Sequence, residues 1–578
     1  MNDSQKAREA GFEESLERRV SCLRRIAILA KKHRKTPLGV CKAVIGGRVL
    51  HPDATEFFRE LPENDRHYWI ASLYTLLMPE ERRRSLAAYF TPPHLAEHAI
   101  SGLVRQGLKL GSDRILDPAS GGAAFLVPLA ATIANSSRRQ GESAKELLEK
   151  INSTIAGIEI EPSLARLSEL LLEDILRPEL TTTGHKLKVP ITRANTLKLK
   201  PQPIFDAVIA NPPYGRIFRP RKQILAQFSE VITDSYVNLY ALFIKQALGW
   251  TRPDGLICLI IPMSFLGGAY FAALRKFILD NTWIIGLDPI EQRSDLFLDV
   301  LCDVCVLTLR KKGSMIRTEK PTSWLLRFQK PRLNLGLLDV PKEPSGRIWA
   351  LPNSAHAEEF FANTYESLES YGYTIKSGYF VWNREKKRYR KGLKPKPNEV
   401  PLYWAHNIKA NGTCKPLAAE PSARNPFGFV DIDSDSAAII HTDAILIQRT
   451  SNSRQKRRLI AAVVSKTKVL GSRGFVTENH TLVVIPSLNK TQQLPMKILC
   501  RLLNSDAVDS RFRRISGTVS VSVSALRALP LPMAEYVLQA FSTAHDDDTA
   551  AKMAYANTHV AQKQSNMITP QRRNPNER

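Results

Sequence analysis

The feature that most constrains this chain is an alternation of short apolar runs with amphipathic stretches between residues 114 and 311. The first four apolar runs lie at 114–119, 154–160, 205–210 and 255–262. Such alternation is typical of parallel strands joined by crossover helices that cover both faces of a sheet. Two further runs, 282–287 and 300–310, have only a short connection between them, which predicts an antiparallel pair at one edge. We therefore expect an α/β fold with a doubly wound sheet.

The rest of the chain has a different pattern of apolar residues. The whole chain of 578 residues is also longer than one hydrophobic core usually serves. Apolar positions recur at helical spacing through 16–30 and 68–77, whereas Pro, Asn and Ser turns interrupt short strand-like runs beyond residue 341. We expect a helical N-terminal region at 1–85, the sheet domain at 86–311, a connector at 312–340, a mixed α+β domain at 341–533 and a polar, disordered tail at 534–578.

The net charge of +26 and the pI of about 9.8 indicate a polyanionic partner. Nucleic acid is favoured over an anionic membrane, because the longest apolar run, at 255–265, is too short to cross a bilayer. Residues 1–34 are charged throughout and lack an apolar signal core, and seven scattered cysteines do not make a disulfide framework. We therefore expect a cytoplasmic protein with no membrane partner.

A glycine-rich turn follows the first apolar run, in the sequence ILDPASGGAAFL at 115–126. Gly121 and Gly122 allow backbone amides to approach a ligand closely at the start of the next helix. No lysine follows the glycines, which argues against a triphosphate ligand. The second run ends in GIEIEP at 157–162, where an acid suits a ribose diol. Glu159 is the first candidate for that contact, and Glu161 is the alternative.

The sharpest motif is NPPYG at 211–215, directly after the run FDAVIA. Two prolines fix the chain in an extended turn and remove two backbone donors. The Asn211 carboxamide and the Pro212 carbonyl are then rigid acceptors, and Tyr214 supplies an aromatic face. This set suits an amino group on a flat ring, since two acceptors take its two hydrogens while the tyrosine stacks on the ring.

With these motifs, residues 86–311 resemble the catalytic domain of the gamma-class N(6)-adenine DNA methyltransferases, the Eco57I-like type II restriction-modification methylases. The resemblance extends to AYFTPPHLAEHAI at 88–100, and the motifs follow the family's order. It implies a seven-stranded methyltransferase sheet and S-adenosylmethionine as the cofactor. The implied cofactor-binding residues are Thr91, Pro92, Asp117, Pro118, Ala119, Gly121, Glu159 and Asn195. Asn195 is a departure, because the family usually has an aspartate at that position.

The resemblance also implies the chemistry. The target adenine rotates out of the duplex, and its amino group receives the methyl group directly, without a metal. Asn211, Pro212, Pro213 and Tyr214 are the implied catalytic residues. Tyr214 and Phe297 are the candidates for stacking on the flipped base.

The second domain, at 341–533, resembles the target-recognition domains of restriction-modification methyltransferases and type I specificity subunits. It implies double-stranded DNA as the partner, through which the protein would associate with the bacterial nucleoid, and a separately encoded restriction endonuclease as a functional partner. The candidate DNA-contacting residues are Arg449, Arg454, Arg457, Arg458, Arg511, Arg513 and Arg514. Two alternatives stay open, namely a methyltransferase acting on ribosomal RNA or a protein glutamine, and the methylase half of a bifunctional restriction enzyme.

Overall fold

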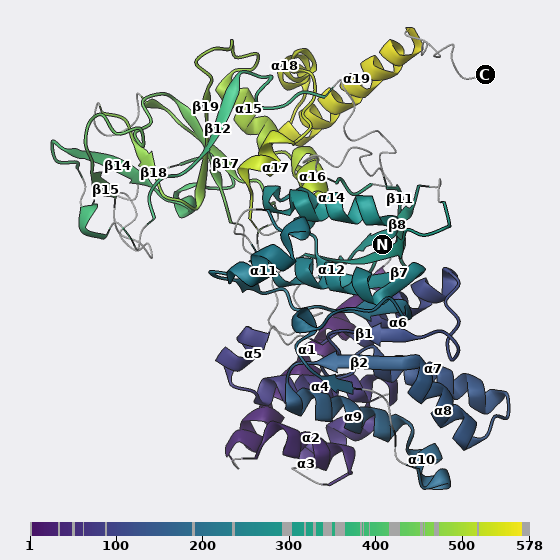
Figure 1. The fold of residues 1–578 in the computed structure, drawn as a ribbon. Coiled ribbons are helices and arrows are strands. Elements are labelled where there is room, and N and C mark those ends of the chain that lie inside the picture. The colour runs from purple at the N-terminus through teal and green to yellow at the C-terminus, as the bar shows by residue number, and fades with distance from the viewer. Residues whose placement is uncertain are drawn as a thin grey trace. The chain divides into compact units, whose positions relative to one another are not determined.

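The computed structural model divides into two compact units, Met1–Phe265 with Tyr270–Leu338, and Leu266–Ala269 with Arg347–Arg578 (Figure 1). The residues that the structure describes are 3–568 except 33–34, 49–51, 62, 87–89, 186, 188–190, 234–236, 292–302, 317–319, 328–330, 339–348, 353–364, 382–383, 385, 392–393, 415–427, 451–454, 456, 467–472 and 517–519. None of the described helices is long and apolar enough to cross a membrane.

The first unit contains a seven-stranded sheet in the order β3-β2-β1-β4-β7-β9-β8. Its strands are β1 (Ile115–Asp117), β2 (Ile155–Glu159), β3 (Ile191–Arg193), β4 (Phe205–Ala210), β7 (Thr251–Pro262), β8 (Thr282–Pro289) and β9 (Val304–Lys311). β3, β2, β1, β4 and β7 pair in parallel, and β9 is antiparallel to both β7 and β8. This confirms the predicted doubly wound sheet and the antiparallel pair at its edge.

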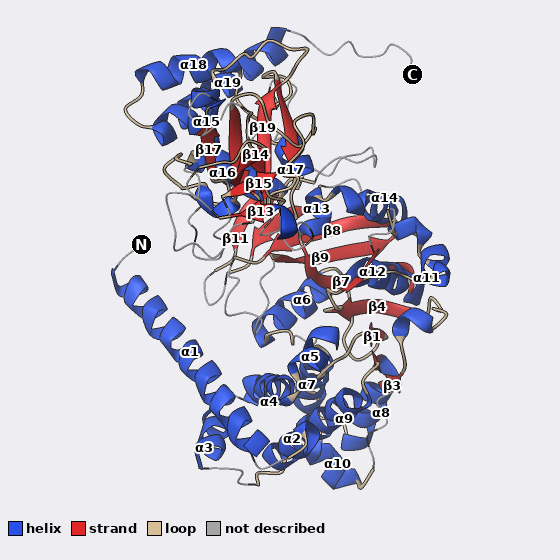
Figure 2. Cartoon of the chain, turned by 90° about the vertical axis from the view of Figure 1, so that its left-hand side faces the viewer, coloured by secondary structure: helices blue, strands red, loops and turns tan. Residues whose placement is uncertain are grey.

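Helices cover both faces of this sheet (Figure 2). The described helices between residues 93 and 281 are α6 (Pro93–Arg105), α7 (Leu126–Arg139), α8 (Ala144–Thr154), α9 (Pro162–Ile175), α10 (Arg177–Thr183), α11 (Lys222–Gln227), α12 (Leu239–Trp250), α13 (Ser264–Gly267) and α14 (Ala272–Asn281). Side chains alternate between the two faces along a strand. Ala207 and Ile209 of β4 share one apolar core with α6 and α7, whereas Val208 lies outside that core and is equally buried. Water is therefore excluded from both faces.

The N-terminal region is helical, and it packs on the sheet domain. Its helices are α1 (Asp3–Lys32), α2 (Pro37–Ile45), α3 (Pro52–Glu60), α4 (Glu63–Leu77) and α5 (Glu80–Leu86). α2 contacts α9 (Figure 1). The side chain of His67 on α4 lies 3.0 Å from the Asp174 carboxylate on α9. Buried residues of α1, α2 and α4 belong to the same apolar core as the helices of the sheet domain. These helices are thus part of the first unit.

Two short strand pairs also belong to the described part of the first unit. They are β5 (Arg216–Ile217) with β6 (Val237–Asn238), and β10 (Thr322–Leu325) with β11 (Leu333–Leu337), both antiparallel. The second pair falls within residues 312–340, the segment expected to be a connector.

The second unit has two four-stranded sheets, in the orders β12-β19-β16-β17 and β13-β15-β14-β18. Their strands are β12 (Tyr373–Ser377), β13 (Tyr389–Arg390), β14 (Glu399–Tyr403), β15 (Phe429–Asp431), β16 (Ala444–Gln448), β17 (Ala461–Val464), β18 (Val476–Thr477) and β19 (Thr481–Pro486). The helices are α15 (Met496–Leu503), α16 (Asp506–Ile515), α17 (Val523–Arg527), α18 (Ala534–Thr543) and α19 (Asp547–Ile568). The unit is thus a mixture of strands and helices.

The prediction of a disordered tail at 534–578 is wrong for its described part, which forms α18 and α19. Tyr555 of α19 is only 3% exposed, and its hydroxyl donates to the Pro530 carbonyl at 2.8 Å. Small side chains such as Ala551 and Ala554 bury one face of α19 closely against the unit. Alanine contributes little to apparent hydrophobicity, so the polar composition of this segment concealed its packing face.

Candidate active site

The first wall of the site is the turn that follows β1. The Asp117 carboxylate accepts a hydrogen bond from the Ala119 amide at 3.0 Å, which closes the turn at the carboxyl end of the strand. Gly121 adopts a φ of +51°, a region that favours glycine. Burial raises the pKa of Asp117 to about 8. A neutral carboxyl group here would ionise readily if a cationic ligand entered the site.

The second wall is Glu159, the last residue of β2. Its carboxylate accepts from the amides of Gly121 and Glu161, each at 2.8 Å, and burial raises the pKa of this carboxyl. Glu161, the alternative acid, lies elsewhere, since its carboxylate forms an ion pair with the Arg82 guanidinium of α5. The structure therefore places Glu159 at the pocket and ties Glu161 to the N-terminal helices.

Asn211, directly after β4, forms the opposite wall. Its Nδ2 donates to the Thr91 hydroxyl at 3.1 Å, and its Oδ1 accepts from the Tyr214 hydroxyl at 2.6 Å. The Tyr214 hydroxyl also lies 3.2 Å from the Ile260 carbonyl of β7. The carboxamide is consequently held at both ends, by a residue that precedes α6 and by the tyrosine of its own motif.

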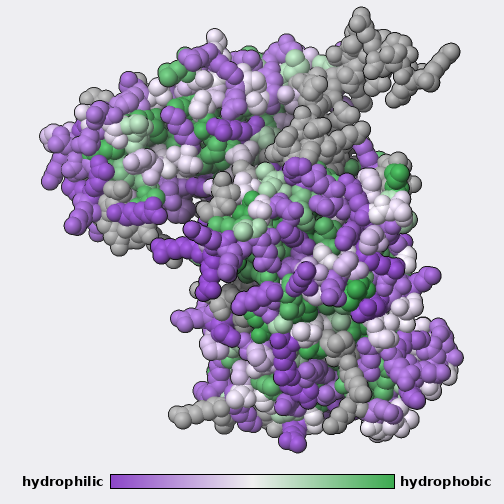
Figure 3. Space-filling view, viewed as in Figure 1, coloured by the Kyte–Doolittle hydropathy of each residue, from purple (hydrophilic) through white to green (hydrophobic). Residues whose placement is uncertain are grey.

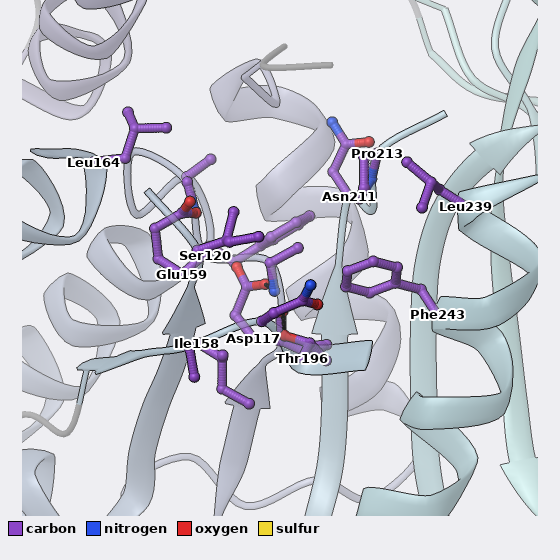
Figure 4. Close-up of a pocket in the computed structure, with 18 of the residues that line it drawn as sticks. Asp117, Ser120, Ile158, Glu159, Leu164, Thr196, Asn211, Pro213, Leu239 and Phe243 are labelled. Atoms are coloured by element: carbon purple, nitrogen blue, oxygen red, sulfur yellow. Dashed lines mark hydrogen bonds between the residues drawn. The ribbon is translucent and has the colours of Figure 1, made fainter. Parts of the chain in front are cut away.

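These walls enclose a pocket of about 200 Å³ at the carboxyl ends of the parallel strands. Figure 4 shows Glu159 and Asn211 on opposite sides of it, with Asp117 and Thr196 between them and the Phe243 ring entering from α12. The lining residues are Phe90, Thr91, Asp117, Pro118, Ala119, Ser120, Gly121, Ala124, Phe125, Ile158, Glu159, Ile160, Leu164, Ala194, Asn195, Thr196, Leu197, Asn211, Pro213, Leu239 and Phe243. The pocket thus combines an apolar wall with a few polar groups, as is usual for small-molecule sites.

Most of the predicted cofactor and catalytic residues line this pocket. Three residues of the two motifs are not among the lining residues. Pro92 caps α6, Pro212 is buried, and Tyr214 donates its hydroxyl hydrogen to Asn211. Asn195 lines the pocket, and its Oδ1 already accepts from the Leu197 amide at 3.0 Å. Phe297 lies outside the described residues. No group of three or more His, Cys, Asp or Glu side chains in the described part of the chain is placed to hold a metal ion.

Sequence reasoning missed the aromatic wall. The Phe90 ring packs over the glycine-rich turn so closely that a Cβ at Gly122 would lie 2.9 Å from it and 2.8 Å from the Ala71 Cβ on α4. The phenylalanine stands beside Thr91 in the AYFTPP run, which was a signal that could have identified it. Phe243 and Leu239 had no such signal, because both look like ordinary core positions of an apolar helix.

The structure differs from the predicted set of DNA-contacting arginines. Arg458 and Arg511 are only 4% and 9% exposed, and the Arg511 guanidinium lies 3.5 Å from the centre of the Tyr555 ring. Arg513 forms an ion pair with Asp509 at 2.7 Å, and Arg514 donates to the Leu351 carbonyl.

The other predicted arginines are also tied to the protein where they are described. Arg449 donates to the Asn479 carbonyl at 3.1 Å, and Arg457 lies 3.8 Å from the Asp506 carboxylate. Arg454 lies outside the described residues. An arginine-rich sequence in a packed α+β domain supplied cations for internal contacts, so the prediction that this set serves DNA is wrong for Arg458 and Arg511, the two most buried members.

Parts of the chain are similar in sequence to known methyltransferases. Residues 137–297 match the family model described as Eco57I restriction-modification methylase. The type II methyltransferase M.PstI of Providencia stuartii is 22% identical over 361 residues, 58% of this chain and 66% of that protein. A putative type II restriction enzyme and methyltransferase of Methanocaldococcus jannaschii is 31% identical over 109 residues, 19% of this chain and 9% of that protein. The chain thus spans less than two thirds of either relative.

Among solved structures, the type IIL restriction-modification enzyme MmeI in complex with DNA has a TM-score of 0.52 at 15% identity, and the match covers 94% of this chain and 88% of that one. The DrdV–DNA complex has a TM-score of 0.50 at 10% identity, with 82% and 59% covered. At these identities the likeness concerns the fold alone. Within residues 137–297 the chain is similar to the Eco57I restriction-modification methylases.

Proposed function

We propose that this chain transfers a methyl group from S-adenosylmethionine to the exocyclic amino group of an adenine in double-stranded DNA. The observation that carries the proposal is the fixed carboxamide of Asn211, which lies on one side of a pocket whose other side holds Glu159 and Asp117. Asn211 is the residue that can face a substrate amino group, and the two acids can face a ligand that carries hydroxyl groups and a positive charge.

The donor chemistry of the pocket fits this cofactor. Glu159 offers carboxylate lone pairs to a ribose diol at the end of β2. Asp117 is a buried carboxyl whose pKa is raised to about 8, so its ionised form gains much from a nearby ammonium group. Phe90, Phe243 and Leu164 supply apolar surface for the rest of the ligand. When bound, the cofactor supplies an electrophilic methyl group.

The chain's own residues then hold the acceptor. The Asn211 Oδ1 accepts one hydrogen of the substrate amino group and the Pro212 carbonyl accepts the other, which directs the nitrogen lone pair into the pocket. An amide cannot take up a proton at neutral pH, so Asn211 stabilises the positive charge that develops on nitrogen, and the proton then passes to water. The oxygen that accepts from Tyr214 in the structure has a second lone pair for this contact.

The proposal of DNA as substrate rests on charge and on family. The chain carries a net charge of +26, the matching family is described as a restriction-modification methylase, and M.PstI is a type II methyltransferase. We assign target recognition to the second unit, because methyl transfer engages a single base and the surrounding sequence must be read elsewhere. In such a system the methylase protects cellular DNA from a separate endonuclease, and we propose that role here.

The test is expression of the chain in cells that lack DNA adenine methylation, followed by long-read sequencing of their DNA. N(6)-methyladenine within one defined motif is the expected result, and the Asn211→Ala variant, expressed to the same level, should leave that motif unmodified. Unmodified DNA with labelled methyl groups on RNA or protein would overturn the proposal.

A further inference from the structure

The loop that follows the NPPYG motif carries an unusual set of side chains. Residues 216–222, which we call the basic loop, contain Arg216, Arg219, Arg221 and Lys222, and no acidic residue lies between 211 and 227. Phe218 stands among these cations and is 77% exposed, although a phenylalanine normally gains stability from burial. Packing within the protein therefore does not explain why an aromatic side chain occupies this position.

The base of the loop is fixed and its tip is free. β5 pairs with β6, and the Leu239 amide donates to the Gly215 carbonyl at 2.8 Å. Leu239 itself lines the pocket, so the base of the loop is joined directly to the site. At the tip, Arg219 adopts a φ of +54°, which is uncommon for a residue with a side chain and marks a shaped turn.

The side chains at the tip are available to a partner. The Arg216 guanidinium lies 5.2 Å from the centre of the Phe218 ring and covers one face, which leaves the ring largely exposed. Within the described part of the chain, Arg219, Arg221 and Lys222 form no ion pair, and all three are exposed. Figure 3 shows the strongly hydrophilic surface over the start of α11 where this loop lies.

We propose that the basic loop grips the DNA strand beside the target adenine, with its cations on the phosphates and Phe218 against the bases next to the flipped nucleotide. The proposal rests on the proposed function. Cations without internal partners suit the phosphate backbone, and an exposed aromatic ring suits unstacked bases. The loop begins five residues after Asn211, so a strand that delivers a base to that carboxamide must pass close to it.

The charge contact is tested by salt dependence on any duplex, which requires no knowledge of the target sequence. The Arg219→Gln/Arg221→Gln/Lys222→Gln variant should weaken binding and reduce the slope of log K against log salt by roughly 2.7, since each phosphate contact contributes about 0.9. The matched control is Arg105→Gln/Lys109→Gln/Arg139→Gln, which removes the same charge from exposed positions near the helix ends that precede and follow β1. The control slope should not change.

An equal reduction of the salt slope in both variants would mean that net charge alone is responsible. An unchanged slope in both would mean that the loop does not touch DNA. Either result overturns the proposal. A loss of binding to anionic lipid vesicles with unchanged DNA binding would also overturn it, because the loop would then serve a membrane surface.

The role of the ring is tested by methyl transfer to the motif that sequencing identifies. Phe218→Ala should lower kcat/KM on duplex DNA about tenfold or more, whereas Phe218→Trp should retain activity. On a duplex with an abasic site opposite the adenine, where flipping is easier, the loss should shrink to about threefold or less. An equal loss of kcat/KM on both substrates would show that Phe218 does not assist the flipping of the base. If the parent protein methylated no DNA while the salt result held, the proposed function would fail and the DNA contact would stand.

Discussion

The Tyr214 hydroxyl donates a 2.6 Å hydrogen bond to Oδ1 of Asn211, the carboxamide oxygen that would accept from the target amino group. Tyr214 does not line the pocket in this structure, so the stacking role that the resemblance implies stays a prediction, whereas its hydroxyl is a fixed support for the proposed catalytic amide. Because these two roles use different atoms of one side chain, substitutions can separate them.

Tyr214→Phe keeps the ring and removes only the hydroxyl, so single-turnover methyl transfer should slow about fivefold, as expected for one neutral hydrogen bond. Tyr214→Ala loses the ring as well and should also bind the duplex target more weakly. Rates measured with labelled cofactor on target DNA distinguish the variants. Equal activity of Tyr214→Phe and the parent protein would show that the hydroxyl does not orient Asn211.

Asn211→Ala removes one acceptor from the proposed transition state and should slow transfer about a hundredfold, which corresponds to about 3 kcal/mol. Asn211→Asp keeps an oxygen acceptor and should retain more activity than the alanine variant. Calorimetric binding of the cofactor should change little in either protein. Transfer by Asn211→Ala at the parent rate would contradict the mechanism.

Glu159→Ala should weaken cofactor binding far more than Glu161→Ala, because only Glu159 lines the pocket. Glu159 also accepts from the Gly121 amide, so Glu159→Gln is the companion variant that retains one such acceptor. Calorimetric titration with S-adenosylmethionine gives the order of the two effects. The opposite order would assign the ribose contact to Glu161.

Asp117 should make the stability of the ligand-free protein depend on pH. Its folded pKa is about 8 because of burial, above an unfolded value near 3.8, so the folded state binds the extra proton between these two values. The free energy of unfolding should therefore decrease as pH rises from about 4 to about 8. Thermal unfolding of Asp117→Asn across this range should show a weaker decrease. Parallel curves for the two proteins would argue against the raised pKa.

Gly122→Ala should destabilise the first unit by about 1–3 kcal/mol, since its Cβ would meet the Phe90 ring and the Ala71 Cβ. Phe90→Leu in the same chain should recover part of the loss by relieving one of the two contacts. Denaturant unfolding of the single and double variants measures the coupling. Additive losses would mean that Phe90 does not limit the turn.

Tyr555→Ala should destabilise the second unit by about 3–5 kcal/mol, because it removes a buried ring and a hydrogen bond to Pro530. Lys552→Ala, on the exposed side of the same helix, serves as the control and should have little effect. Limited proteolysis followed by mass spectrometry reports the loosening of α19.

The sheet could be predicted because strand periodicity and turn chemistry act locally. Asp117, Glu159 and Asn211 each stand at the end of an apolar run, and parallel strands bring such ends to one edge. The partners that orient them could not be predicted in the same way. Arg82 reaches Glu161 across 79 residues, and Thr91 reaches Asn211 across 120, so these contacts depend on packing that no local pattern records.

For the arginines of the second domain, the sequence predicted a contact with DNA where the structure shows burial. Arg458 and Arg511 lie in basic segments, and such a composition favoured a nucleic-acid surface. Burial depends on which side of a strand or helix faces the core. For Arg511 the deciding neighbour is Tyr555, from a segment whose polar composition predicted disorder.

The shared core of the N-terminal helices and the sheet determines where this chain could be cut and rejoined. Trp69, Ile70 and Ala71 of α4 belong to the same buried core as the helices beside the glycine-rich turn, and Arg82 anchors the acid that follows Glu159. A chimaera joined at residue 86 would separate the buried residues of the N-terminal helices from the rest of that core. Exchange of specificity between relatives would therefore have to treat the first helices and the sheet as one inherited block, with the junction placed beyond β11.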